Sequence, residues 1–395
     1  MEVKPGYKQT EVGVIPADWE VKPLSIVLVK GRLGGNYSNQ SAETRFPLMK
    51  MGNLARGSFD TSKIEHIAPN IQPEEAHRLS FGDVLFNTRN TLELVGKVAM
   101  WRDELPVAYY NSNLMRLEFN PAEICSNEYA NAALNTNRSI AKLRALATGT
   151  TSVAAIYTRD LLEMHFIVPP IPEQRAIATA LSDMDALLDG LDRLIAKKRA
   201  IKQATMQQLL TGQTRLPGFS GEWEVKRLGA LCSLKSGESI TSENIDETSE
   251  FPCYGGNGLR GYTKNHTHDG DHVLIGRQGA LCGNVVTASG KFFASEHALV
   301  VSSMPEVAIK WLSYILSEEN LNQYSESSAQ PGLSATKLLR LQFNAPPTKE
   351  EQTAIAAILS DMDTEITALE TRRTKTRALK QAMMQELLTG RTRLI

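Results

Sequence analysis

One segment of this 395-residue chain occurs twice. Residues 173–216 read EQRAIATALSDMDALLDGLDRLIAKKRAIKQATMQQLLTGQTRL, and residues 351–394 read EQTAIAAILSDMDTEITALETRRTKTRALKQAMMQELLTGRTRL. More than half of the paired positions are identical, at a constant offset and without a gap. A repeat of this length indicates a duplicated structural unit, so the sequence predicts two tandem copies of one architecture.

Each copy of the repeat is predicted to be one long helix. Both copies follow a pair of prolines and end at Leu-Leu-Thr-Gly, where Gly212 and Gly390 are expected to stop the helix. Between these signals there is no proline, and the only glycine is Gly190. At about 1.5 Å per residue, each continuous helix would be about 57 Å long.

Apolar residues recur along both copies at alternating steps of four and three, which is typical of a coiled-coil seam. They are Ile177, Leu181, Met184, Leu188, Leu191 and Ile195 in the first copy and Ile355, Leu359, Met362, Ile366 and Leu369 in the second. Each copy is acidic early and basic late, so antiparallel pairing would place opposite charges together. We therefore expect an intramolecular antiparallel pair; the alternative is two unrelated solvated helices.

Composition narrows the class of protein. A chain of this length can bury two or three cores. No apolar run is long enough to cross a bilayer and the polar start MEVKPGYKQTEVG lacks signal-peptide character, so we expect a cytoplasmic protein without a membrane partner. Cys125, Cys232, Cys253 and Cys282 show no CxxC spacing and are expected to be reduced. Because the net charge is −1, any nucleic-acid contact must use local basic patches.

A short motif marks the start of each unit, because Trp19-Glu20-Val21-Lys22 recurs as Trp223-Glu224-Val225-Lys226. The predicted segments are an arm over 1–20, a globular domain over 21–168, a central helix over 169–216, a connector over 217–224, a second globular domain over 225–345 and a C-terminal helix over 346–395. Both globular domains are expected to mix α and β structure. Strands are predicted at 46–54, 83–89, 95–101, 113–120, 271–277, 283–288 and 297–303, and helices at 126–147 and 306–320.

Two motifs resemble ligand-binding sequences but lack the secondary structure that such sites require. The run Gly256–Gly261 fits the GxGxxG pattern, but no helix follows it to hold a pyrophosphate. A glycine-rich loop that presents Asn257, Arg260 and Tyr262 to another surface is the better interpretation. The stretch from His266 to His272 could supply metal ligands, but a surface turn does not fix their geometry, so no metal site is predicted.

Catalytic motifs are equally incomplete. The Glu-x-Lys triplets at Glu20 and Glu224 lack the partnering acids of a nuclease and are better explained as strand starts. Asn344-Ala345-Pro346-Pro347 lacks the aromatic residue of a loop that holds a flipped adenine, and no GxxxxGK[ST] loop for ATP is present. We predict no catalytic residue in this chain.

Polar and basic residues on the predicted loops remain as candidates for reading DNA, because such side chains contact base edges and phosphates. In the first domain they are Arg32, Asn36, Tyr37, Lys50, Asn53, Arg56, Arg89 and Asn90. In the second domain they are Lys235, Asn257, Arg260, Lys264, Arg277 and Gln278. Each of these is individually more common as a solvated surface residue.

Over its whole length the chain resembles the specificity subunit of Type I restriction-modification systems. The resemblance is carried by the arm GYKQTEVGVIPADWE, the phrases PPIPEQRAIATALSDMDALLDGL and PPTKEEQTAIAAILSDMDTEI, the ends QQLLTG and QELLTG, and YGGNGLRGY with GDHVLIGRQG. It implies a mixed α/β fold in which two target-recognition domains are held apart by two long antiparallel coiled-coil helices, with an internal pseudo-twofold repeat. Each domain would read one half of a bipartite site on double-stranded DNA.

The resemblance also implies partners. Two methyltransferase subunits would bind S-adenosylmethionine and methylate adenine, and motor-nuclease subunits would use ATP with Mg for cleavage, so this chain would hold no cofactor. The polar interruption of the helix seam, at Lys198, Lys202, Arg373 and Lys380, is the expected place for partner contacts. Rival hypotheses are a self-sufficient methyltransferase or nuclease with degenerate motifs, and a purely structural coiled-coil scaffold.

Overall fold

The structure is a computed structural model that describes residues 4–279, 282–325 and 332–395. The chain forms two compact units. Unit 1 comprises Met1–Leu191 together with Arg372–Ile395, and unit 2 comprises Asp192–Thr371. Residues 1–3 of the predicted arm lie outside the described residues.

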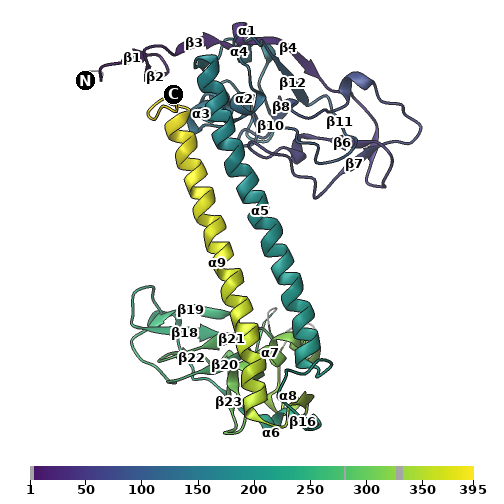
Figure 1. Cartoon of the computed structure of the whole chain (residues 1–395), viewed down its shortest axis with the longest axis vertical. Coiled ribbons are helices and arrows are strands. Elements are labelled where there is room, and N and C mark those ends of the chain that lie inside the picture. The colour runs from purple at the N-terminus through teal and green to yellow at the C-terminus, as the bar shows by residue number, and fades with distance from the viewer. Residues whose placement is uncertain (1–3, 280–281, 326–331) are drawn as a thin grey trace. The chain divides into compact units, whose positions relative to one another are not determined.

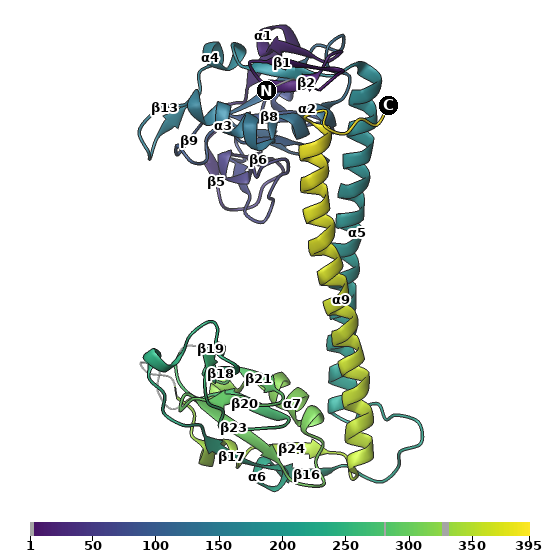
Figure 2. The same cartoon turned by 90° about the vertical axis from the view of Figure 1, so that its left-hand side faces the viewer.

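Two long helices, α5 (Ile171–Leu210) and α9 (Lys349–Leu387), confirm the helix prediction. Both stop before a glycine in the left-handed region, Gly212 at φ 75° and Gly390 at φ 69°. In unit 1 the first half of α5 lies beside the last part of α9, and in unit 2 the second half of α5 lies beside the first part of α9 (Figures 1 and 2). The helices run in opposite directions in both units, as the charge gradient predicts.

Unit 1 is built on a four-stranded antiparallel sheet in the order β10-β8-β12-β4. Its strands are β4 (Leu28–Leu33), β8 (Val84–Asn87), β10 (Val98–Met100) and β12 (Leu114–Phe119). A second sheet, in the order β11-β6-β7-β5, consists of β5 (Asn39–Gln40), β6 (Pro47–Met49), β7 (Glu65–Ile67) and β11 (Tyr109–Tyr110). In the second sheet β11 and β6 are parallel.

Smaller elements complete unit 1. The arm forms a hairpin of β1 (Tyr7–Thr10) and β2 (Gly13–Pro16), and β3 (Glu20–Pro23) pairs with β15 (His165–Val168). A three-stranded sheet joins β9 (Arg89–Asn90), β14 (Ala154–Ala155) and β13 (Thr148–Gly149). The helices are α1 (Leu24–Val27), α2 (Asn127–Leu134), α3 (Asn137–Ala145) and α4 (Thr158–Leu162).

Unit 2 repeats this plan. Its main sheet has the order β17-β23-β20-β21, formed by β17 (Cys232–Ser236), β20 (His272–Gly276), β21 (Val285–Ala288) and β23 (Ala298–Ser303). Its second sheet joins β18 (Phe251–Gly255), β19 (Gly258–Thr263) and β22 (Phe293–Ala294), with β18 and β22 parallel. The remaining elements are β16 (Glu224–Arg227), β24 (Gln342–Ala345), α6 (Leu228–Leu231), α7 (Ile309–Glu318) and α8 (Ala335–Leu338).

The two units share one topology. The order β4-β12-β8-β10 in unit 1 corresponds to β17-β23-β20-β21 in unit 2, and the parallel pair β6/β11 corresponds to β18/β22. The strand that opens each domain, β3 or β16, pairs with the strand before the long helix, β15 or β24. The Glu-x-Lys triplets lie in β3 and β16, as predicted.

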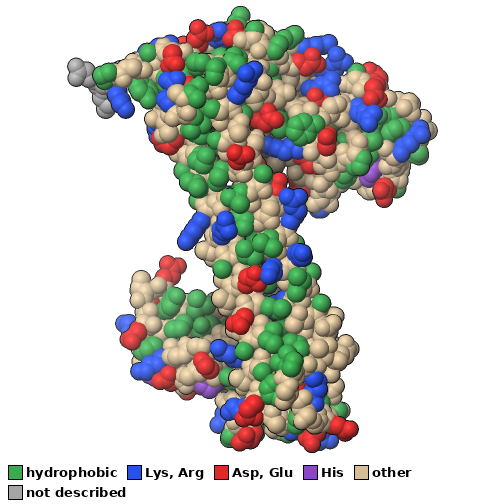
Figure 3. All heavy atoms as spheres, viewed as in Figure 1, with side chains coloured by type: hydrophobic (Ala, Val, Ile, Leu, Met, Phe, Trp, Pro, Cys, Tyr) green, Lys and Arg blue, Asp and Glu red, His purple; other side chains and the backbone are tan. Residues whose placement is uncertain are grey.

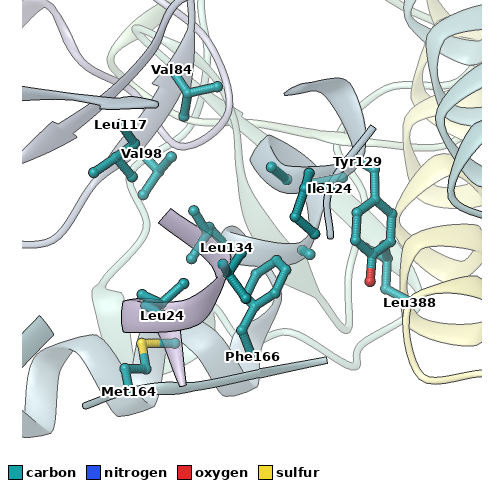
Figure 4. Packing of buried hydrophobic residues seen from close by; sticks show 14 of the residues in the cluster. Leu24, Val84, Val98, Leu117, Ile124, Tyr129, Leu134, Met164, Phe166 and Leu388 are labelled. Carbon is teal, nitrogen blue, oxygen red and sulfur yellow. The ribbon is translucent and has the colours of Figure 1, made fainter. Parts of the chain in front are cut away.

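A continuous apolar core ties the globular part of unit 1 to its helices. One buried cluster contains Val84 and Val98 of the main sheet, Tyr129 of α2, Ile177 of α5 and Leu388 just after α9. Figure 4 shows part of this cluster. In unit 2, α7 packs on the main sheet and on Ile355 and Leu359 of α9. In both units the seam residues nearest the domain are buried against it.

Three sequence predictions need correction. The helix expected at 126–147 is two helices, because Thr136 accepts a hydrogen bond from the Ser139 amide and starts α3 anew. The strand expected at 46–54 ends at Met49, because the Asn53 side chain accepts from the Lys50 amide and closes a short 3-10 turn.

The glycine-rich run forms a hairpin rather than a loop. Only Gly256 and Asn257 lie in the turn between β18 and β19, where Gly258 adopts φ 88°. Arg260 and Tyr262 lie on strand β19.

Candidate nucleic-acid interface

Three candidate residues of unit 2 come together where β20 leaves the main sheet. Arg277 Nη1 donates to Ser236 Oγ at 3.1 Å, and the Arg277 amide donates to the His297 carbonyl at 2.8 Å. Gln278 Oε1 lies 2.9 Å from His297 Nδ1, and a Cβ on Gly256 would lie 3.2 Å from the Gln278 carbonyl. The turn that carries Asn257 therefore packs beside Arg277 and Gln278.

The corresponding place in unit 1 holds Arg89 and Asn90. These residues follow β8 as Arg277 and Gln278 follow β20, at the same spacing from a Gly-Asp pair. Asn90 pairs with Ala154 in an antiparallel strand, and Gln278 makes an antiparallel bridge to Gly332. The Ile156 amide donates to the Thr88 carbonyl and the Leu333 amide donates to the Arg277 carbonyl, so the backbone is held in the same way in both units. In this register Gln278 corresponds to Arg89, which pairs with Ala155, and Asn90 lies one residue further along.

A second group of unit 1 is basic and surrounds the loop before β10. Arg56 Nη1 donates to the Gly96 carbonyl at 3.5 Å, and Arg144 Nη2 donates to the Glu93 carbonyl at 3.2 Å. Burial lowers the pKa of Lys97, and Arg56 lowers it further. Burial likewise lowers the pKa of Arg56, with a contribution from Arg144. These crowded cations favour an anionic partner.

The other candidates of unit 1 are mostly engaged within the fold. The Tyr37 hydroxyl lies 2.7 Å from His77 Nδ1, and Lys50 Nζ lies 2.9 Å from Glu65 Oε2. Asn53 is only 7% exposed and donates to two loop carbonyls, which weighs against a DNA contact. Arg32 lies on β4 near Glu118, and Asn36 is exposed.

In unit 2 the remaining candidates are exposed. Lys235 lies on β17, Arg260 on β19 and Lys264 just after β19. Arg260 Nη2 is 3.5 Å from Ser242 Oγ. The role of every candidate in binding DNA stays a prediction, since geometry alone does not test it.

Sequence reasoning missed several residues at these places. His297 precedes strand β23 without a motif, and Lys97, Arg138, Lys142 and Arg144 are scattered in sequence. Burial lowers the pKa of Arg138 and of Lys142, and Arg138 adds to the effect on Lys142. A count of basic residues on α3 would have signalled this patch, whereas His297 could be found only from the fold.

Acidic and basic side chains are interspersed over the face drawn in Figure 3, which agrees with the net charge of −1.

The residues expected to contact partners lie along the helices. Lys202 donates to Asp363, Lys380 donates to Asp185, and Lys198 Nζ lies 2.7 Å from Glu365 Oε1. These three lysines therefore pair the two helices. Arg373 also lies on α9. Partner contact by any of the four stays a prediction.

A matched junction joins each arm to the helices. In unit 1, Trp19 Nε1 donates to Glu173 Oε2 at 2.8 Å, and Arg393 Nε donates to Glu173 Oε1 at 2.5 Å. Arg393 also donates to both Asp18 carboxylate oxygens, at 3.0 and 2.9 Å. The hydrogen bonds that Arg393 donates to Glu173, followed by those that it donates to Asp18, raise the pKa of Arg393. Trp19 and Arg393, which are distant in sequence, thus meet at the buried Glu173 carboxylate, and Arg393 also bonds Asp18.

Unit 2 contains the equivalent junction. Trp223 Nε1 lies 3.3 Å from Glu351 Oε1, and Arg215 Nη2 donates to Glu351 Oε2 at 2.6 Å. The glutamine after this glutamate in each repeat bonds the backbone of its globular domain. Gln174 Oε1 accepts from the Cys125 amide, and Gln352 Oε1 accepts from the Ala308 amide. The Glu-Gln pair of the repeat is therefore a structural clamp.

Within the part of the chain that the structure describes, no group of three or more His, Cys, Asp or Glu side chains could hold a metal ion. All four cysteines are free thiols. Among the described residues, no helix combines the length and apolar character needed to span a bilayer.

The sequence matches the family model described as "Type I restriction modification DNA specificity domain" over residues 16–201 and again over residues 220–378. The chain belongs to this family. The predicted Type I specificity subunit is thereby confirmed, and the two matches coincide with the two repeats of sheet and helix.

Individual relatives support the same family assignment. A stretch of 147 residues is 50% identical to the Type I restriction enzyme EcoprrI specificity subunit of Escherichia coli, covering 36% of this chain and 36% of that protein. The putative type I restriction enzyme MjaX specificity subunit of Methanocaldococcus jannaschii is 25% identical over 415 residues, covering 98% of this chain and 96% of that protein. The crystal structure of a Type-I restriction-modification system S subunit from M. genitalium superposes with a TM-score of 0.65 at 17% identity, covering 98% of both chains. That likeness supports the fold.

Proposed function

We propose that each unit reads one half of a split DNA site, with Asn90 and neighbouring Arg89 reading one half and Gln278 with Arg277 reading the other. The matched place of the two pairs carries this proposal, because both lie just after the corresponding strands β8 and β20 and the same backbone contacts hold them. Asparagine and glutamine amides can bond adenine bidentately, and arginine can bond guanine. A shared scaffold with a different side chain at one place is what two readers of different half-sites require.

The basic group around Arg56, Lys97 and Arg144 would contact DNA phosphates beside the half-site of unit 1. Phosphate contacts position a protein on DNA without reading its sequence. Because the chain has a net charge of −1, partner subunits would supply many of the remaining phosphate contacts.

The two long helices would separate the half-sites and bind partners. Their buried residues at steps of four and three support a coiled coil with internal pseudo-twofold symmetry. We propose that two methyltransferase subunits dock on this pair and bind S-adenosylmethionine, and that motor-nuclease subunits supply ATP-driven cleavage. In this proposal the chain itself is non-catalytic, binds no cofactor and acts in the cytoplasm.

The test is co-expression of this chain with a candidate methyltransferase subunit, followed by mapping of methylated adenines by single-molecule sequencing. A split motif with a fixed gap, lost when this chain is omitted, is the expected result. Methylation that does not depend on the chain would overturn the proposal in favour of a structural scaffold. Binding of S-adenosylmethionine by the isolated chain would instead favour a self-sufficient enzyme.

A further inference from the structure

The two units contain a matched contact around an aspartate in the middle of each helix. Asp185 on α5 and Asp363 on α9 occupy the same position of the repeat, as do Lys202 on α5 and Lys380 on α9. In unit 1 Lys380 donates to Asp185 Oδ1, and in unit 2 Lys202 donates to Asp363 Oδ1. Each unit therefore joins its two helices through one aspartate and one lysine.

The second oxygen of each aspartate faces the globular part of its own unit. In unit 2, the Tyr314 hydroxyl on α7 donates to Asp363 Oδ2 at 2.8 Å, and Lys202 Nζ lies 5.5 Å from the centroid of the Tyr314 ring. In unit 1, Arg102 Nη2, just after β10, lies 3.7 Å from Asp185 Oδ2. The third partner of the aspartate is thus a hydrogen-bonded phenol in unit 2 and a guanidinium at ion-pair distance in unit 1.

The Tyr314 hydrogen bond is directional, whereas the apolar packing around it is not. The Arg102–Asp185 contact is an ion pair at 3.7 Å and contributes charge attraction. Apolar cores hold each globular part against its helices in proportion to buried area, but a hydrogen bond to a carboxylate weakens steeply when its angle changes. Burial, followed by the bond to Asp363, raises the pKa of Tyr314, so its hydroxyl remains a donor. A single carboxylate on the helix therefore favours one orientation of the domain.

We infer that Asp185 and Asp363 are positioning residues that fix the orientation of each globular domain on the helix pair, through Arg102 and Tyr314, and so set which spacer between half-sites is accepted. This inference rests on the proposed reading of a split site. One base pair of spacer rotates the half-sites by roughly 34–36°, so a loosened domain would accept neighbouring spacer lengths.

The test uses the full chain with its methyltransferase partner and DNA substrates whose spacers have the natural length or one base pair more or less. For Tyr314→Phe we expect the ratio of methylation between natural and altered spacers to fall about tenfold, with methylation of the natural site near that of wild type. The matched control is Tyr324→Phe, because the Tyr324 hydroxyl donates to Glu319 Oε1 at 2.7 Å inside the globular part. The control should keep the wild-type ratio.

In unit 1, Arg102→Gln should lower the same ratio and Arg102→Lys should restore most of it, because lysine keeps the charge. Arg78→Gln, which removes a 3.2 Å ion pair with Glu75 away from the helices, serves as its control. An unchanged spacer ratio in Tyr314→Phe and Arg102→Gln, or equal changes in the controls, would overturn the inference while leaving the proposed function intact. Absence of split-site methylation by the wild type would instead refute both.

Discussion

At the scale of single residues, the molecule uses the same positions for structure and different side chains for recognition. Glu173 and Glu351 are each 1% exposed and bind a tryptophan and an arginine from distant parts of their unit. Arg89 and Gln278, in contrast, occupy one backbone position with different side chains, since Arg89 pairs with Ala155 and Gln278 with Gly332. Structural residues are repeated and candidate reading residues diverge, which is the expected result of duplication followed by a change of specificity.

Replacing Gln278 by alanine should relax recognition of one half-site only. Loss of a bidentate amide contact is worth about 1–3 kcal/mol of discrimination against the wrong base, and methylation of substrates with each base changed in turn measures it. Asn90→Ala should affect the other half-site. Gln323→Ala, whose amide bonds Glu319 within unit 2, is the control; equal loss at both halves for either variant would argue against independent readers.

Replacing Arg393 by alanine should destabilise unit 1 by about 2–3 kcal/mol, because the buried Glu173 carboxylate loses its charged partner. The loss should not be larger, because the Arg393 side chain is only partly buried. Urea unfolding measures the change. Arg391→Ala removes only an exposed pair with Glu386 and should change stability by less than about 1 kcal/mol. The prediction fails if the two variants unfold alike.

At the scale of elements, the turn before β20 places the His268 imidazole against the ring of Phe292. His268 stacks on Phe292 with centroids 5.3 Å apart, and its Nδ1 lies 2.7 Å from the Thr267 hydroxyl. Burial lowers the pKa of His268, and nearby His272 lowers it further while Glu238 opposes this. The folded state therefore disfavours protonated His268.

Unit 2 should consequently lose stability as the pH falls below 6.5, the ordinary value for this histidine. The sign follows because the unfolded chain takes up the proton first, so stability is fully present above that pH. Thermal unfolding measured from pH 7.5 to 5 should show a smaller decline for His268→Gln than for wild type. An identical decline in both proteins would assign the effect to other groups.

Much of this architecture was predictable because its signals are local. The steps of four and three, the proline pairs and the terminal glycines defined α5 and α9, and short runs of apolar residues located β8, β12, β20 and β23. The junctions were not predictable, because Trp19 and Arg393 reach Glu173 across 154 and 220 residues of sequence. For the same reason the gathering of Arg277, Gln278 and His297 required the fold.

At the scale of the whole molecule, α5 and α9 are each continuous and contribute residues to both units. The register between the two helices is nevertheless fixed by a separate contact in each unit. Asp185 with Lys380 fixes it in unit 1, and Asp363 with Lys202 fixes it in unit 2. Gly190 and its repeat equivalent Ala368 lie close to where each helix passes from one unit to the other. An insertion at these two points leaves both aspartate–lysine contacts intact, although it separates Glu370 from Arg199.

Seven residues inserted after Gly190 together with seven after Ala368 should therefore lengthen the accepted spacer by about three base pairs, since each heptad adds roughly 10 Å. Methylation of a library with variable spacers measures the change. The same insertion in α5 alone mismatches the helix pair and should lower activity on every spacer. An unchanged spacer with the double insertion would contradict the view that the helices set the distance.

The division of the chain between the units also bears on synthesis. Unit 2 is contiguous, so all its residues have been translated once Thr371 is made, whereas unit 1 needs Arg372–Ile395. During translation, which normally favours folding from the N-terminus, the packing of α9 against the first globular part must therefore wait until Arg372–Ile395 has been made. A nonsense mutation near Arg372 would leave all of unit 2 but remove the part of α9 that packs against the first globular domain. Quality control should therefore detect such a product through unit 1, whose globular domain is translated before unit 2.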